Sequence, residues 1–213
     1  IRPRDWSSDV CSSDLIGKVL CDSPVVRHLS FTGSTPVGKT LMRQSASTVK
    51  KLALELGGHA PFIVFDDADL DAAVEGAVQS KYRNAGQTCV CTNRFYVQDG
   101  IYDAFTERFA EAVKRIRVGD GIAPETQQGP VIDEQAMQKI ESHVSEAIAK
   151  GGRLLAGGRR IQADTLFFEP TVIADVPEHA LIMSEETFGP VAAIARFTDE
   201  QQAVVAANDT DSG

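Results

Sequence analysis

The chain has 213 residues with a formal net charge of −9, and 43% of its residues are hydrophobic and 24% charged. This length and composition are typical of a globular protein with one core, or with one domain and part of a second. The acidic balance argues against a nucleic-acid partner. No apolar run approaches the ~20 residues of a membrane span, so we expect no membrane partner.

The cysteines and histidines indicate a compartment and exclude some kinds of site. Four cysteines, Cys11, Cys21, Cys89 and Cys91, are too few for a disulfide framework at this length, which predicts a reducing, cytoplasmic location. The four histidines have no metal-ligand spacing with one another or with the cysteines. We therefore expect them to be structural or surface residues and predict no metal site.

Residues 1–15 differ from the rest of the chain. The near-repeat of Ser7–Cys11 and Ser12–Leu15 has neither helical nor strand periodicity. We predict that residues 1–15 are non-native or disordered and leave them out of the expected fold, together with Trp6. No signal peptide is visible, and we expect that the natural N-terminus is missing.

The region from 25 to 65 alternates between strand and helix patterns. Pro36 is placed to begin a helix, and the alternation of leucines before Gly57 is typical of a strand that ends there. We expect a strand over 25–31, a helix over 36–47, a strand over 52–56 and a buried strand over 61–65.

Apolar residues at helical spacing predict three longer helices after residue 65. The first begins near Leu70, the second ends near Gly119, and the third begins at the N-cap residue Asp133 and ends at Gly151. Strands are expected at 94–98, 153–156, 168–174 and 191–197. Helices that alternate with strands indicate an α/β fold with a mainly parallel sheet.

A cysteine in a glycine-flanked segment is the first candidate for chemistry. The segment Asn84–Cys91 reads NAGQTCVC, and a nucleophilic cysteine needs partial exposure and a favoured thiolate, which such a loop can provide. The alternative is that Cys89 is a small buried hydrophobic residue, because free cysteines are among the most buried residues. The residues alone leave both interpretations open.

A glutamate between two leucines is the second candidate. Glu55 lies in the sequence LELGG, and burial of a carboxylate without a partner is costly. A raised pKa would suit a general base that works near neutral pH. On the residues alone, however, an edge strand with Glu55 in water is the better interpretation.

Four motifs together resemble the aldehyde dehydrogenase superfamily. They are FTGSTPVGK (31–39), LELGG (54–58), NAGQTCVC (84–91) and EETFGP (185–190), in the order and approximate spacing of that family. The resemblance runs from about Ile16 to Gly213. The segment KYRNAGQTCVC resembles the succinate-semialdehyde dehydrogenase branch in particular.

The resemblance implies roles for six residues of the reaction. It makes Cys89 the nucleophile and Glu55 the base that activates water for hydrolysis of the thioester. It places four residues at the cofactor: Gly33 and Ser34 by the pyrophosphate at a helix N-terminus, and Glu186 and Phe188 by the nicotinamide ribose and ring. Without the other motifs, Glu186 would be interpreted as a solvated acid in a turn. The resemblance implies NAD or NADP as the cofactor, and the choice between them stays open because the family segment that contacts the ribose 2′ position is missing.

Two more residues take expected roles from the semialdehyde branch. Arg83 lies six residues before Cys89, where this branch binds the distal carboxylate of its substrate, and a guanidinium pairs well with a carboxylate. The alternative is a surface arginine at a helix end. Cys91 could form a strained redox disulfide with Cys89, or it could serve only for packing.

The expected domains follow the family pattern. Residues 16–57 would be the C-terminal part of a Rossmann-like cofactor domain, and residues 58–213 most of the catalytic domain. The resemblance implies a small-molecule aldehyde substrate for the whole enzyme, which we expect to be a homo-oligomer. A chain of this extent could also be an inactive fragment of the dehydrogenase.

A nucleotide hydrolase is the competing interpretation. Residues 33–40, GSTPVGKT, match the P-loop pattern, and the run from Phe62 to Asp67 mimics a Mg²⁺-binding strand. This alternative explains neither Glu55 nor Cys89 and leaves the EETFGP motif without a role. We therefore expect the match to be coincidental.

Overall fold

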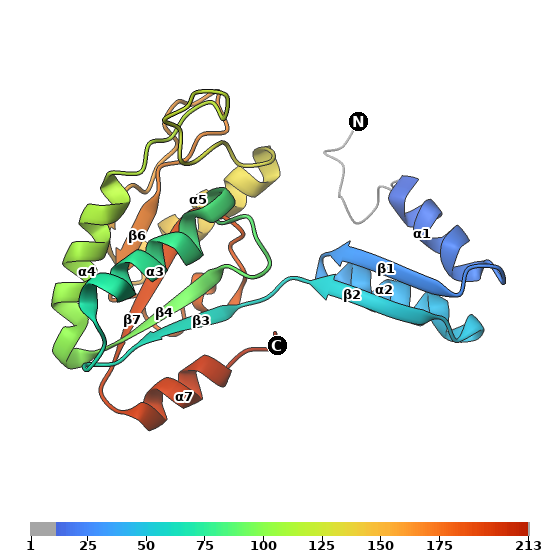
Figure 1. Ribbon diagram of the computed structural model, residues 1–213, viewed down its shortest axis with the longest axis horizontal. Coiled ribbons are helices and arrows are strands. Elements are labelled where there is room, and N and C mark those ends of the chain that lie inside the picture. The colour runs from blue at the N-terminus through green and yellow to red at the C-terminus, as the bar shows by residue number, and fades with distance from the viewer. Residues whose placement is uncertain (1–11, 213) are drawn as a thin grey trace. The chain divides into compact units, whose positions relative to one another are not determined.

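The computed structural model describes residues 12–212, and their side chains from Leu15 onward. The chain divides into two compact units, one ending at Gly57 and one that begins at Gly58. Both are built from strands and helices, which confirms the α/β prediction (Figure 1). No helix in the described part of the chain is both long and apolar enough to cross a membrane.

The N-terminal unit is a strand–helix–strand arrangement with one additional helix. Its elements are α1 (Ser12–Asp22), β1 (His28–Gly33), α2 (Thr35–Ser45), the 3₁₀ turn η1 (Ala46–Thr48) and β2 (Lys51–Leu56). The strands β1 and β2 are parallel, so the chain must cross over between them, and α2 makes this connection. A proline near the start of α2 and a left-handed residue after η1, Val49, explain where the helical segment begins and ends.

The core of the N-terminal unit is small. Cys21 of α1, Leu29 of β1 and Leu41 of α2 form its buried cluster. Helix α1 begins at Ser12, so it includes the last four residues of the stretch that we left out of the expected fold. Whether this stretch is native stays a prediction, and residues 1–11 lie outside the described residues.

The second unit contains a five-stranded sheet covered by helices. Its strands are β3 (Ala60–Val64), β4 (Thr92–Gln98), β5 (Arg153–Ala156), β6 (Thr171–Ala174) and β7 (Val191–Phe197). Its helical elements are α3 (Leu70–Tyr82), η2 (Arg83–Gly86), α4 (Asp99–Lys114), α5 (Glu134–Ala149), α6 (Leu181–Ser184) and α7 (Glu200–Asn208). The strand order is β3-β4-β7-β6-β5, and every pair is parallel except β5 with β6.

Alternating side chains of the sheet build two hydrophobic cores, one on each face. Phe95 and Val97 of β4 pack with α3 and α4, whereas Tyr96 between them belongs to the cluster with α5, α6 and α7. Figure 1 shows α3 and α4 together on one face of the sheet. Parallel sheets are normally buried on both faces, and burial on both faces explains why β7, VAAIARF, is a nearly continuous apolar run.

Most expected elements are present, with some shifted boundaries. The Asp133 side chain accepts a hydrogen bond from the Ala136 amide at 2.8 Å, which confirms the predicted cap of α5. The strand expected over 168–174 is shorter, because Phe168 pairs with Arg160 in an isolated bridge and β6 begins only at Thr171. The apolar pattern does not predict α6, a single turn, or α7, which buries only Ala203.

Removal of the Phe109 ring should destabilise the second unit strongly. Phe109 is fully buried, and its ring centroid lies 5.3 Å from that of Phe95 and 5.5 Å from that of Phe105. We expect Phe109→Ala to lower the free energy of unfolding by about 3–5 kcal/mol, because it removes buried contacts and leaves a cavity. Urea denaturation of the chain measures this value, and Val205→Ala, at a residue that is 59% exposed, should change it by less than about 0.5 kcal/mol. Similar losses in the two variants would contradict the expected role of the aromatic core.

Candidate active site

Three segments that are far apart in the sequence precede three neighbouring strands of the second unit. The residues Gly58 and His59 come before β3, the segment 83–91 comes before β4, and the segment 185–190 comes before β7. Because β3, β4 and β7 are adjacent and parallel, the amino ends of the strands meet at one edge of the sheet. Parts of three of the four motifs are thereby brought together.

Gly58 contacts both of the other segments. Its amide donates a hydrogen bond to Glu186 Oε1 at 3.3 Å, and its carbonyl accepts one from Asn93 Nδ2 at 3.4 Å. A Cβ atom at Gly58 would lie 3.1 Å from the Cys89 carbonyl oxygen, which is tighter than an ordinary contact. Glycine is therefore favoured at this position, and the second glycine of LELGG has a packing role that the sequence did not reveal.

The loop before Cys89 has an unusual backbone. Asn84, Ala85 and Gly86 have φ angles of 53°, 55° and 70°, in the left-handed region that residues with a Cβ rarely adopt. A Cβ atom at Gly86 would lie only 2.1 Å from the Gly189 carbonyl oxygen. The loop thus packs directly on the EETFGP segment, and its strain is of the kind that often occurs at functional sites.

Gln87 connects the same loop by hydrogen bonds to the segment 130–132 of the second unit. Its Nε2 donates a hydrogen bond to the Pro130 carbonyl at 3.3 Å, and its Oε1 accepts one from the Ile132 amide at 2.8 Å. The motif NAGQTCVC contained this residue, but spacing alone could not assign its partners. Gln87 is therefore a structural anchor of the loop that carries Cys89.

The two cysteines of the loop have different surroundings. Cys89 is partly exposed, whereas Cys91 is 3% exposed and its Sγ donates a hydrogen bond to the Gly86 carbonyl at 3.2 Å. Partial exposure argues against the alternative that Cys89 is only a buried hydrophobic residue. Within the described residues, neither Cys91 nor Cys21 forms a disulfide.

Glu186 and Phe188 of the EETFGP segment differ in their surroundings. Burial raises the pKa of the Glu186 carboxyl, while the Gly58 amide and the ammonium groups of Lys139 and Lys81 act in the opposite direction. Phe188 has a left-handed backbone with φ of 52° and is 38% exposed. Glu186 is thus not a fully solvated acid, and the Phe188 ring is accessible for packing against a ligand.

Arg83 is exposed at the end of α3. Its guanidinium makes no hydrogen bond or ion pair with any residue in the described range, so its donors are available to an external anion. This position also fits the alternative interpretation, in which Arg83 is only a surface residue at a helix end. Its role as a substrate ligand stays a prediction.

The other three predicted residues belong to the N-terminal unit. Gly33 ends β1, and Ser34 is the extended N-cap residue of α2, with a side chain that makes no capping hydrogen bond. Glu55 of β2 pairs in register with Thr32, directly before Gly33. Taken by itself, this unit exposes Glu55 on the face opposite to Leu54, and the expected proximity of Glu55 and Cys89 stays a prediction.

The fold does not support the P-loop interpretation. Helix α2 begins at Thr35, so Gly38 and Lys39 lie inside the helix instead of in a phosphate-binding loop. A Cβ at Gly38 would lie 2.7 Å from a methyl carbon of Leu56, which gives this glycine a packing function. The strand that mimics a Mg²⁺-binding element, β3, belongs to a different sheet from β1.

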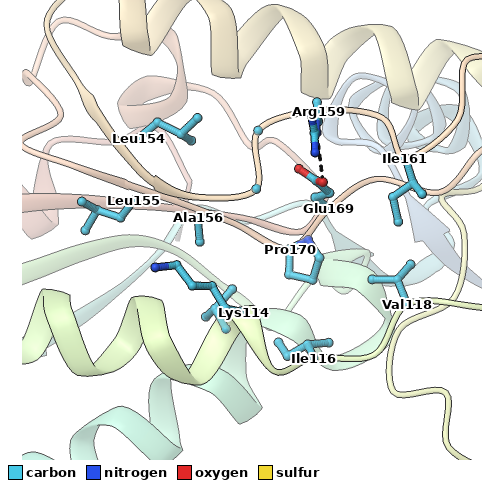
Figure 2. Close-up of a pocket in the computed structure, with 13 residues that line it drawn as sticks. Lys114, Ile116, Val118, Leu154, Leu155, Ala156, Arg159, Ile161, Glu169 and Pro170 are labelled. Carbon is cyan, nitrogen blue, oxygen red and sulfur yellow. Dashed lines mark hydrogen bonds and ion pairs between the residues drawn. The ribbon is translucent and has the colours of Figure 1, made fainter.

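An open pocket lies elsewhere in the second unit. It has a volume of about 810 Å³ and is lined by residues of α4 and β5 and of the loops beside them, including the ion pair of Arg159 and Glu169 (Figure 2). None of the predicted site residues lines it. Within residues 12–212, no group of three or more His, Cys, Asp or Glu side chains is arranged to hold a metal ion.

The sequence and structure were compared with known proteins. Residues 8–213 match the model of the Aldehyde dehydrogenase family. The chain is 54% identical over 202 residues to succinate-semialdehyde dehydrogenase (NADP(+)) GabD of Escherichia coli (strain K12), covering 95% of this chain and 42% of that protein. It is 57% identical to a 3-sulfolactaldehyde dehydrogenase of Pseudomonas putida, with the same two coverages.

A solved structure is equally similar. The succinate-semialdehyde dehydrogenase of Burkholderia pseudomallei superimposes with a TM-score of 0.91 at 56% identity, covering 93% of this chain and 41% of that one. The chain thus spans about two fifths of the length of the relatives that it matches. The family match over nearly the whole sequence, together with the meeting of three motifs at one sheet edge, shows that the chain belongs to the aldehyde dehydrogenase family.

Proposed function

We propose that the whole protein is an NAD(P)-dependent dehydrogenase that oxidises an aldehyde with a distal anionic group, with succinate semialdehyde as the expected substrate. The observation that carries this proposal is the contact of Gly58 with both Cys89 and Glu186. It joins the nucleophile loop to the carboxyl group expected at the cofactor. Glu55 lies three positions before Gly58 in the sequence.

The proposed reaction begins at the Cys89 sulfur. The thiolate attacks the aldehyde carbon and forms a thiohemiacetal, whose oxyanion is held by the Cys89 backbone N–H. Bound NAD⁺ or NADP⁺ supplies the hydride acceptor. Loss of hydride leaves a thioester on Cys89, and Glu55 then takes a proton from water, which attacks the thioester and releases the carboxylic acid.

Several residues fit parts of a dinucleotide. The N-terminus of α2 offers backbone N–H groups that the Ser34 side chain does not cap, and such helix ends bind pyrophosphate well. Glu186 can accept hydrogen bonds from ribose hydroxyls, and the exposed ring of Phe188 can pack beside the nicotinamide. These features support NAD or NADP without a preference for either.

The chemistry of Arg83 supports the substrate class. A guanidinium that makes no ion pair within residues 12–212 suits a distal carboxylate, which it can bind with two parallel hydrogen bonds. The names of the relatives include succinate semialdehyde, glutarate semialdehyde and 3-sulfolactaldehyde, and each of these aldehydes carries an acid group. A homo-oligomeric state and a cytoplasmic location belong to the same proposal, supported by the family resemblance and by cysteine usage. Because we expect the chain by itself to be inactive, the tests use the full-length enzyme that contains it.

Loss of the nucleophile and loss of the base should differ in pre-steady-state kinetics. Cys89→Ala should abolish formation of reduced cofactor, because no thiohemiacetal can form. Glu55→Gln should give a rapid burst of reduced cofactor and then a steady-state rate lower by about 10²–10⁴-fold, because the thioester is no longer hydrolysed efficiently. Stopped-flow absorbance with NAD⁺ or NADP⁺ measures both phases.

The exposed residue Glu107 of α4 provides the matched control for this experiment. Glu107→Gln should leave both the burst and the steady-state rate unchanged. If Glu55→Gln turned over like the wild-type enzyme, Glu55 would not be the base.

Arg83 should matter only for substrates with an anionic end. We expect Arg83→Ala to lower kcat/KM for succinate semialdehyde by about 10–100-fold, mainly through KM, because charge-assisted hydrogen bonds contribute about 1.5–3 kcal/mol. An uncharged aldehyde of the same length should be affected much less, and Arg115→Ala, at another exposed arginine, should affect neither. Equal losses of kcat/KM for the charged and the uncharged substrate would contradict the role of Arg83 as a ligand of the substrate carboxylate.

Peroxide sensitivity tests the role of Cys91. Oxidation of the Cys89 and Cys91 thiols by hydrogen peroxide would form one disulfide and two waters, and Cys91 would have to leave its hydrogen bond to Gly86. We expect peroxide inactivation of the wild type to be reversed by thiols, and that of Cys91→Ala to become irreversible as Cys89 is oxidised further. Cys21→Ala should behave as the wild type, and thiol-reversible inactivation in Cys91→Ala would contradict the disulfide.

A further inference from the structure

Lys81 is a buried cation behind the nucleophile loop. It lies in the last turn of α3, it is 0% exposed, and its Nζ makes no hydrogen bond to any protein atom in the described part of the chain. An isolated ammonium group is costly to bury unless a negative charge compensates it. A partner of opposite charge should therefore lie nearby.

Two groups that can carry a negative charge act electrostatically on Lys81. They are the Cys91 thiol and the Glu186 carboxyl, and both favour the charged form of Lys81, whereas burial lowers its pKa. Cys91 donates a hydrogen bond to the Gly86 carbonyl, and a thiol that donates is neutral. Glu186 remains as the anion that can compensate Lys81.

The other ionisable groups around Lys81 do not replace this interaction. Burial lowers the pKa of His59 to about 4, so the imidazole is neutral at physiological pH. The buried Arg94 guanidinium donates hydrogen bonds to the carbonyl oxygens of His59, Ala206 and Ala207. Neither residue provides a negative charge.

Two cations from different helices act electrostatically on Glu186. Lys139 of α5 and Lys81 of α3 both oppose the rise that burial causes in the pKa of Glu186, and the effect of Lys139 is the larger of the two. Lys139 is exposed, so water and salt screen its charge. Lys81 lies in the dry interior, where a charge acts with less screening, so its effect should persist at high ionic strength.

We propose that Lys81 is a positioning residue for cofactor binding: its buried ammonium group holds Glu186 in the carboxylate form that accepts hydrogen bonds from the cofactor ribose. This inference rests on the proposed function, which assigns the ribose to Glu186. A carboxylate offers two acceptor oxygens, whereas a protonated carboxyl group has one oxygen occupied by hydrogen. Lys81 would thus act on the cofactor only through Glu186.

The test is the pH dependence of cofactor affinity in the full-length enzyme. Affinity should fall as pH decreases through the pKa of Glu186, and Lys81→Met should move this fall to higher pH because the compensating charge is gone. We expect Kd for NAD⁺ or NADP⁺, measured by calorimetry over a pH series, to rise about 10-fold relative to wild type on the acidic side of this fall, which corresponds to one pKa unit. The two curves should converge at alkaline pH, where Glu186 is ionised in both proteins.

Three further variants separate charge from structure. Lys81→Arg keeps the charge and should retain the wild-type pH profile, whereas Lys81→Leu should repeat the effect of Lys81→Met. Lys139→Met should have an effect at low salt that disappears in about 1 M salt, where the screening length is about 3 Å. Met and Leu replace a desolvated charge by apolar atoms, so thermal unfolding should show no loss of stability.

Cofactor binding by the Glu186→Gln variant distinguishes a failure of this inference from a failure of the proposed function. If Lys81 acts through Glu186, Lys81→Met should cause no additional change in Kd there. A wild-type pH profile for Lys81→Met, with weaker binding in Glu186→Gln, would overturn this inference and leave the proposed function intact. Unchanged binding in Glu186→Gln would show that the ribose role itself is wrong, and this inference would fail with it.

Discussion

The parallel alignment of β3, β4 and β7 is the constraint on which the candidate site depends. Adjacent parallel strands have their amino ends at the same edge, so the segments that lead into them must lie side by side. In most open α/β sheets the ligand lies at the carboxyl ends, but the cysteine loop here precedes its strand. In the N-terminal unit, by contrast, Gly33 and Glu55 lie at or near the carboxyl ends of their strands.

The loops that contain Gly86 and Gly189 also pack closely together at this edge. Gly86 and Gly189 come together at a distance that leaves no space for a side chain, and the left-handed backbone at Asn84 and Ala85 turns the chain into this contact. Local strain of this kind persists only where the surrounding structure holds it. Gln87 contributes to holding it, through hydrogen bonds to the segment after residue 129.

Arg94 and Lys81 are both buried cations near this edge, but they differ in whether their hydrogen-bond donors have acceptors. Arg94 has its donors satisfied by backbone carbonyls, which fixes His59 and the end of α7 without the need for a carboxylate. Lys81 has no such acceptors among the described residues, and its charge interacts with Cys91 and Glu186. Satisfied donors indicate a structural role, whereas an unsatisfied buried charge is typical of functional sites.

The sequence by itself determined the fold class, the cap of α5 at Asp133 and Cys89 as the reactive candidate, because apolar periodicity and the four motifs are local features. It could not reveal that Gly58 contacts Cys89 and Glu186, or that Lys81 is fully buried and acts electrostatically on Glu186. Position 81 lies in the last turn of α3, where a lysine would ordinarily extend into water. Only the tertiary structure decided these points, since a contact between residues 58 and 186 depends on the order of strands in the sheet, and periodicity along the chain carries no information about that order.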